Sequence, residues 1–350
     1  SSMTIPMYFA NVLKKIGIED NVGIGVTNSR NDVPVTSIIS WKEPDYIGAV
    51  GDTCYIVTGN LTLLPGELPG VYNGEQAAIF KCNDEDYNKQ QATLITIPAT
   101  RSSDNSVTST VEVSLNEDDN NILNLSRSMK MKGATKTIVS AMVDYNAWMR
   151  AVENYLEIPE KKRAKLKVDS VEVKKRLDEV FEQEAEVILG VKPSTIHSYN
   201  ITSIGGTPDQ PTVDYNMTCE VEGLVKRAGD DIVISLGRLI GDQYKVEGEE
   251  RNRQSHIFRS SPNQYRHTIT FTIPEGYTVT EESMQLLNKS VSYDCGMFVS
   301  QAKVADNVLT LRVQERYIRY FEPIDRWPMF LELIDASAAY SNAVVILTKQ

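Results

Sequence analysis

Apolar residues near the start of the chain recur at helical spacing and predict an amphipathic helix that ends at Gly17. The positions are Tyr8, Phe9, Val12, Leu13 and Ile16. Runs of apolar and β-branched residues follow, separated by turn-forming residues, and they predict strands. These runs are 22–27, 35–41, 46–50, 54–58 and 76–81. The first part of the chain is therefore expected to be one helix packed on a small sheet.

The pattern changes after residue 92, where alternating strand-like runs predominate. The predicted strands are 92–100, 106–115 and 122–132, the last two joined by the polar turn 116–121. Apolar residues then return to helical spacing over 138–155 and again over 173–188. A β-sheet with a helical hairpin on one face is expected here.

Strand-like runs return from His197 and continue almost to the end of the chain. The last block predicts hairpins from 267–279, 291–304 and 307–318. The stretch 323–343 then predicts one long helix with Pro323 and Pro328 near its start, and 343–349 predicts a closing strand.

Polar or Gly/Pro-rich joints suggest where this α+β chain divides into domains. The polar stretch after residue 82 places one boundary near residue 86, and the Gly/Pro-rich stretch after residue 204 places another. The predicted units are 1–86, 87–205 and 206–350. The first is a helix on a sheet, the second a β domain with a helical hairpin, and the third a β domain with a terminal helix.

Composition excludes several classes of protein. The chain of 350 residues is 41% hydrophobic and 24% charged, as is ordinary for a folded protein. A net charge of -11 repels phosphate backbones, so nucleic acid is not expected as a partner. The sequence holds no apolar run long enough to span a bilayer. Its four cysteines form no CxxC pair, which excludes zinc-ribbon and thioredoxin-type motifs; they are Cys54, Cys82, Cys219 and Cys295.

Two stretches resemble one family. YFANVLKKIGIED (8–20) and CYIVTGNLTLLPGELPGVYNGEQAAIF (54–80) resemble the back half of a bacterial transglutaminase-like core. The stretch 270–347, with its Pro-x-x-x-Trp-Pro helix, resembles the β domain of unknown function that follows such cores in exported, multidomain Bacteroidetes proteins. The resemblance implies a periplasmic or cell-surface location and β-sandwich-like domains. Because the chain opens at Ser1 without Met, we expect the native N-terminus and any signal peptide to lie upstream. The resemblance also implies a further β domain before the core.

The resemblance also implies where a catalytic Cys, His and Asp would stand, and this chain fills those positions with residues that cannot replace them. The nucleophile position corresponds to Ser2, the His position to Thr36 or Ser37, and the Asp position to Val57. Hydroxyl groups do not ionise near neutral pH, and Val carries no exchangeable proton. Residues 1–80 contain no His at all. These vacant positions predict a degenerate transglutaminase-like core, a pseudoenzyme.

The expected function is a non-catalytic exported binding or scaffolding protein whose partner is a protein or a glycan, with no cofactor and no metal. The alternative is an active transglutaminase or cysteine-protease-like enzyme. In that case the nucleophile lies outside this chain or the positions above are misaligned. A Cys or Ser, a His and a carboxylate or amide converging within hydrogen-bond reach would distinguish the second hypothesis from the first.

Other candidate sites are better explained as structural. His256 and His267 with Cys219 or Cys295 could ligate a metal, but the spacing of the two histidines matches no ligand pattern. The acidic turn 116–121 lacks the Gly and closing Glu of a calcium loop. The run Glu182, Glu184 and Glu186 predicts an exposed helix face. The aromatic residues of the C-terminal stretch could line a partner surface, but a packing seam is favoured; they are Tyr317, Tyr320, Phe321 and Trp327.

Overall fold

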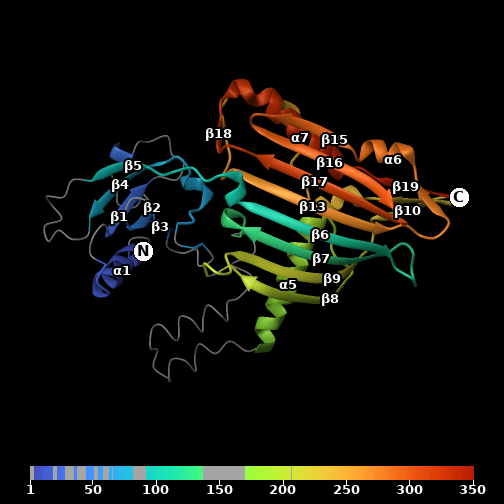
Figure 1. Ribbon diagram of the computed structural model, residues 1–350, viewed down its shortest axis with the longest axis horizontal. Coiled ribbons are helices and arrows are strands. Elements are labelled where there is room, and N and C mark those ends of the chain that lie inside the picture. The colour runs from blue at the N-terminus through green and yellow to red at the C-terminus, as the bar shows by residue number, and fades with distance from the viewer. Residues whose placement is uncertain are drawn as a thin grey trace.

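The computed structural model describes residues 4–18, 22–27, 35–37, 45–50, 54–57, 63–64, 66–81, 92–136, 170–205 and 207–350. Over these residues the protein is α+β, with most of its regular structure in antiparallel sheets (Figure 1). The first unit is helix α1 (Thr4–Lys15) beside a five-stranded antiparallel sheet of order β3-β2-β1-β4-β5. Its strands are β1 (Val22–Thr27), β2 (Asp45–Val50), β3 (Cys54–Val57), β4 (Gln76–Lys81) and β5 (Thr93–Thr96).

Most of the local predictions for this unit are confirmed. Helix α1 is followed by Gly17 with φ +83°, a backbone conformation that glycine adopts without strain. Strands β1 to β4 lie where the alternating runs predict them. The predicted strand over 35–41 is wrong at its start, because Val35–Ser37 form a 3-10 helix, η1, and residues 38–41 lie outside the described part. Pro34 precedes this turn, and η1 buries only Val35.

The main body of the protein is one eight-stranded sheet of order β15-β16-β17-β13-β6-β7-β9-β8 (Figure 1). Its central pair, β13 and β6, is parallel, and all its other pairs are antiparallel. The strands are β6 (Ser106–Leu115), β7 (Leu123–Lys132), β8 (Thr195–Ile204), β9 (Thr212–Val221), β13 (Asn263–Thr272), β15 (Lys289–Tyr293), β16 (Gly296–Ala305) and β17 (Val308–Tyr317).

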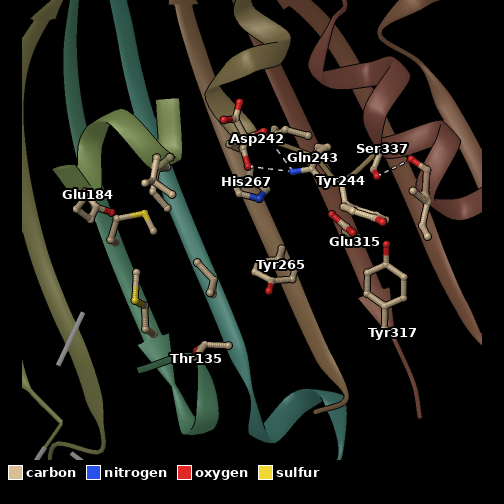
Figure 2. A pocket seen from close by; sticks show the side chains of 18 of the residues that line it. Thr135, Glu184, Asp242, Gln243, Tyr244, Tyr265, His267, Glu315, Tyr317 and Ser337 are labelled. Atoms are coloured by element: carbon tan, nitrogen blue, oxygen red, sulfur yellow. Dashed lines mark hydrogen bonds between the residues drawn. The ribbon is translucent and has the colours of Figure 1, made fainter. Parts of the chain in front are cut away.

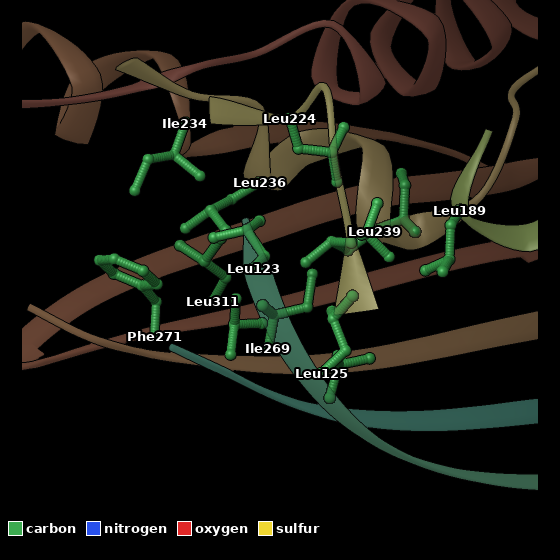
Figure 3. Packing of buried hydrophobic residues seen from close by; sticks show 14 of the residues in the cluster. Leu123, Leu125, Leu189, Leu224, Ile234, Leu236, Leu239, Ile269, Phe271 and Leu311 are labelled. Carbon is green, nitrogen blue, oxygen red and sulfur yellow. The ribbon is translucent and has the colours of Figure 1, made fainter. Parts of the chain in front are cut away.

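A second layer covers one face of this sheet. It contains helices α5 (Ser170–Leu189), α6 (Glu281–Leu286) and α7 (Trp327–Ser341) and the 3-10 turn η6 (Leu236–Ile240). It also contains a four-stranded sheet made of β10 (Val225–Ala228), β11 (Asp231–Ile234), β19 (Val345–Lys349) and β14 (Tyr277–Val279). Leu123, Ile269 and Leu311 of the large sheet pack against Leu236 and Leu239 of η6 (Figure 3). We call the covered side the inner face and the opposite side the outer face.

A smaller cluster lies at one end of the molecule, where α7 meets β17. Trp327 and Phe330 of α7 pack with Tyr317, whose ring centroid is 5.2 Å from that of Phe330. The aromatic positions Tyr317 and Trp327 therefore form a packing seam, as predicted. Pro323 caps the short turn before α7, and Pro328 stands in its first turn, where a missing amide proton costs no helical hydrogen bond.

Neither predicted domain boundary separates two sheets. Strand β5 lies beyond residue 86, yet it pairs with β4 and completes the first sheet. The boundary at residue 205 falls between β8 and β9, which are neighbours in the large sheet. Strands of the predicted second and third units share that sheet and its hydrophobic core, since β13 pairs with β6. The chain was divided at two polar joints, but each joint connects strands that pair with each other in one sheet.

The helical hairpin is seen in part. Helix α5 confirms the second predicted helix, with Phe181, Ala185 and Leu189 buried in the core. The first predicted helix, over 138–155, lies outside the described residues. No helix in the described parts of the chain is long and apolar enough to cross a membrane.

The loop between β3 and β4 fastens the first unit to the main body. The amide of Asn73 donates to the Ser260 carbonyl oxygen at 3.3 Å. Gly70 lies so close to this backbone that an added Cβ would stand 2.0 Å from the Ser260 oxygen. The 3-10 turn that holds Gly70, η2 (Gly70–Tyr72), therefore requires a residue without a side chain at its first position.

Candidate ligand-binding pocket

The inner face of the large sheet is not covered everywhere, and a pocket of about 510 Å³ opens between the sheet, α5, η6 and α7 (Figure 2). We call it the inner pocket. Cavities of this size hold small organic ligands. Its floor is built by side chains that alternate to the inner face along β13 and β17, namely Tyr265, His267, Glu315 and Tyr317.

The register of the sheet brings the polar floor residues together. Tyr265 on β13 stands directly opposite Glu315 on β17. On the other side of β13, His267 is the register partner of Ser109 on β6. Opposed side chains on paired strands lie about 5 Å apart at their Cβ atoms. Tyr265, His267 and Glu315 of the floor and Ser109 of β6 therefore lie close together across three strands.

The rest of the lining is mainly apolar. Strands β6 and β7 contribute Val107, Met129 and Met131, and the facing surface of α5 contributes Val187 and Ile188. Methionine side chains are flexible and polarisable, so they adapt to ligands of different shape. The pocket thus has a polar end on β13 and β17 and an apolar end on β6, β7 and α5.

The mouth of the pocket exposes apolar side chains. Val187 of α5 is 64% exposed, and Tyr244, on the segment that follows η6, is 65% exposed. The side-chain amide of the neighbouring Gln243 donates to the carbonyl oxygens of Ile240 and Gly241 (Figure 2). These hydrogen bonds hold the segment that follows η6 in a turn. Two large apolar groups at the rim of a concave site indicate a surface that a ligand would cover.

His267 is the most unusual group in the pocket. Its side chain is buried, and its Nδ1 atom has no hydrogen-bond partner among the described residues. Burial and, to a smaller extent, the positive charge of Arg127 lower the pKa of His267 to about 4. The imidazole is therefore neutral at physiological pH, with one nitrogen that donates and one that accepts a hydrogen bond.

Glu315 has the opposite shift. Burial raises the pKa of this carboxyl group, while a hydrogen bond from Tyr317 and the charge of Arg259 oppose the rise. The pKa of Tyr317 is itself well above its usual value, because its hydroxyl is buried beside Glu315. Arg259 lies over the Tyr317 ring, with Cζ 3.6 Å from the centroid, and donates to the Asn263 side chain at 3.2 Å. The polar end of the pocket therefore contains one cation, Arg259, that interacts electrostatically with one carboxyl group, Glu315.

A buried ion pair next to the pocket fixes α5 to the sheet. Arg127 of β7 donates to both carboxylate oxygens of Glu184, each at 3.0 Å, and both side chains are less than 5% exposed. The Tyr215 hydroxyl also donates to Glu184. Such bidentate pairs are the strongest geometry that an arginine and a carboxylate can adopt.

This ion pair corrects one sequence-based prediction and reveals residues that it missed. The run Glu182, Glu184 and Glu186 was expected on an exposed helix face, but Glu184 is buried. It lies three residues after Phe181, on the side of α5 that meets the sheet. The alternation along β7 carries the matching signal, because Arg127 stands at an inward position between Leu125 and Met129.

Of the positions inferred from the transglutaminase resemblance, those that the structure describes do not line the inner pocket. Thr36 and Ser37 are exposed in η1, and Val57 lies in β3 of the five-stranded sheet. Ser2 lies outside the described residues. The convergence of these positions stays a prediction.

The other candidate ligands are dispersed over the structure. Cys219 belongs to the main core, Cys295 to the smaller cluster around α7, and His256 accepts a hydrogen bond from the Ile324 amide at 3.1 Å. In the turn 116–121, the Asn116 and Asp119 side chains accept hydrogen bonds from backbone amides of the same turn. No group of three or more metal-ligating side chains occurs among the residues that the structure describes.

Comparison with protein-family models, with curated proteins and with solved structures finds no match to this chain. The candidate site is therefore assigned on geometry and chemistry alone.

Proposed function

We propose that this chain is a non-catalytic binding protein, and that its inner pocket holds an amphiphilic small molecule with an apolar body and an uncharged polar end. The observation that carries the proposal is the unpartnered Nδ1 atom of buried His267 in an otherwise largely apolar cavity. A buried polar atom without a partner costs free energy, and a ligand that hydrogen-bonds to it removes that cost.

The charges around the pocket support a neutral polar group on the ligand. His267 is uncharged near neutral pH, and the positive charge of Arg259 acts on Glu315 at the polar end. The charges of Arg127 and Glu184 are already paired with each other. A ligand that brought an ionised group into this site would bury a charge without a dedicated counter-ion, which is costly. A ligand amide or hydroxyl incurs no such cost.

Several contacts support a role without covalent chemistry. The Ser337 hydroxyl at the pocket wall donates to the Ile334 carbonyl oxygen at 2.9 Å. Burial raises the pKa of the Cys219 thiol to about 11 and that of Cys295 above its usual value, and neither residue lines the pocket. A thiol with a raised pKa is a poor source of thiolate. We further propose that the first unit is the degenerate transglutaminase-like core, in an exported protein.

Binding of three ligands with the same alkyl chain tests the proposal: dodecanamide, dodecanoate and dodecylammonium. We expect dodecanamide to bind at least about tenfold more tightly than either ion at pH 7, as measured by isothermal titration calorimetry. His267→Leu should weaken dodecanamide binding. Thr110→Val, on the outer face of the same sheet, is the matched control and should leave binding unchanged.

Two results would contradict this proposal. The first is dodecanamide binding that Thr110→Val and His267→Leu affect equally, because the ligand would then not be in the pocket. The second is transglutaminase, deamidase or peptidase activity of the purified chain. Such activity would favour the alternative, an active enzyme whose catalytic residues were misaligned.

A further inference from the structure

The outer face of the eight-stranded sheet is polar along β6, β7 and β13, with Met297 and Val299 of β16 as apolar neighbours, and its charges contrast with those of the whole chain. Hydroxyl and amide side chains occupy most of its central positions. They include Thr108, Thr110, Ser126, Ser128, Thr268, Thr270, Thr310, Gln301 and Gln314. Basic residues lie among them, although the net charge of the chain is -11. An unbalanced local charge on an acidic protein indicates a surface with its own electrostatic function.

Three arginines lie side by side at the centre of this face. Arg266 on β13 stands opposite Gln314 on β17, and Arg312 and Arg316 are the outward residues on either side of Gln314. Each of these two is therefore a diagonal neighbour of Arg266, at about 7–8 Å between Cα atoms. Lys130 lies in the same transverse row as Arg266, because both are register partners of Thr108.

The central guanidinium groups have no carboxylate partners in the described part of the chain. Arg266 and Arg312 are exposed, and neither forms an ion pair with any residue that the structure describes. Arg316 donates its Nε proton to the Ser102 hydroxyl at 2.8 Å. Lys130 is 3.5 Å from Asp214 at the edge of the group. Adjacent like charges on a sheet are destabilising, so this arrangement costs stability and contributes nothing to the core.

We propose that the outer face binds an acidic polysaccharide, with its carboxylate or sulfate groups on Arg266, Arg312 and Arg316 and its hydroxyl groups on the surrounding Ser, Thr and Gln side chains. Guanidinium groups bind planar and tetrahedral oxyanions through paired N–H donors. Hydroxyl and amide side chains donate and accept hydrogen bonds, as sugar hydroxyls do. The chemistry of both components of such a polymer is therefore present on one face.

Other anionic partners fit this face less well. A protein interface is expected to have buried aromatic or aliphatic anchors, and the central outer positions of β6, β7 and β13 offer none. Single-stranded nucleic acid stacks its bases on aromatic side chains, which these positions also lack. The positive charge on the face attracts an anionic chain. This attraction acts over about 10 Å, the screening length at moderate salt.

Biolayer interferometry with dextran sulfate and neutral dextran of equal length tests the proposal. We expect the folded chain to bind dextran sulfate, with an affinity that falls as salt rises, and not to bind dextran. The double variant Arg266→Ser/Arg312→Ser should bind at least about tenfold more weakly, because it removes charge-assisted hydrogen bonds. The matched control is Lys226→Ser/Arg227→Ser on β10, which removes the same charge from exposed positions of another sheet and should retain binding.

Three outcomes would overturn this inference. Equal losses in the two double variants would show that only net charge matters. Binding of poly-glutamate as tight as that of dextran sulfate would indicate an acidic polypeptide partner, and tighter binding of single-stranded DNA would indicate a nucleic acid. Because the face lies on the opposite side of the sheet from His267, His267→Leu should leave dextran sulfate binding unchanged. The proposals for the two faces therefore fail independently.

Discussion

Lys136 and Glu67 join the first unit of the chain to its main body. The Lys136 Nζ atom lies 2.6 Å from Glu67 Oε2, and the lysine side chain is completely buried. Lys136 also donates to the carbonyl oxygens of Gly205 and Pro211, at 3.2 and 3.1 Å. Glu67 belongs to the Gly-Glu-Leu-Pro loop, and the same carboxylate oxygen accepts a hydrogen bond from the Leu64 amide at 2.9 Å.

Loss of this pair should loosen the first unit. Glu67→Ala leaves the Lys136 charge buried with carbonyl partners only, and we expect the free energy of unfolding to fall by about 3 kcal/mol. Chemical denaturation measures this change. Glu222→Ala removes an exposed carboxylate of the main body and is the control, with an expected change below about 0.5 kcal/mol. Equal effects in the two variants would show that the pair does not join the units.

The Arg127–Glu184 pair should be more sensitive to the loss of one partner than to the loss of both. Glu184→Gln leaves the Arg127 charge buried without a counter-ion, with an expected loss of about 3–5 kcal/mol in unfolding free energy. The double variant Arg127→Met/Glu184→Leu should be closer to the parent protein, because no unpaired charge remains. A double-mutant cycle in urea measures the coupling, and strictly additive losses would contradict this prediction.

Because of His267, the unfolding free energy of the protein should be lower at pH 5 than at pH 7. Its pKa of about 4 in the folded state lies below the ordinary value of 6.5, so the unfolded chain binds the extra proton between these pH values. Its contribution to stability is therefore complete above pH 6.5 and is lost as the pH falls toward 4. From pH 7 to pH 5 the loss is at most about 2 kcal/mol.

Chemical denaturation of His267→Gln at the same two pH values is the comparison. Glutamine stays neutral, so the variant should lose less stability than the parent protein between pH 7 and pH 5. Burial raises the pKa of Glu315, which favours the folded state in acid and acts in the opposite direction, but this group is present in both proteins. The difference between the parent protein and the variant therefore isolates His267. An equal loss of unfolding free energy in both proteins from pH 7 to pH 5 would be inconsistent with a neutral buried imidazole.

Cys219 and Cys295 should react with thiol reagents only after unfolding. Both thiols are buried, and burial raises their pKa values, to about 11 in the case of Cys219. We expect iodoacetamide at pH 8 to leave both residues unlabelled in the native protein and to label them fully in urea, as measured by peptide mass spectrometry. Rapid native labelling of either residue would support a catalytic thiol.

Local structure was largely predictable from the sequence. The limits of β4 (Gln76–Lys81) and the position of Pro328 in the first turn of α7 follow from side-chain periodicity and from the geometry of proline. The buried face of α5 also follows from its 3.6-residue period, apart from Glu184. A hydrophobicity pattern marks Glu184 as polar and assigns it to the surface. It becomes a core residue only because Arg127 stands opposite it.

Which strands pair was decided by the tertiary structure. Periodicity shows which side chains of β6 and β13 share a face, but it does not show that these strands, far apart in the sequence, lie side by side in parallel. That pairing joins two predicted domains into one sheet and places His267 beside Ser109, and the pairing of β13 with β17 gathers three arginines on the outer face. The sequence by itself determined the elements and their buried faces, because these depend on near neighbours along the chain. Only the tertiary structure decided the pocket and the cationic face, because both depend on which distant strands come into register.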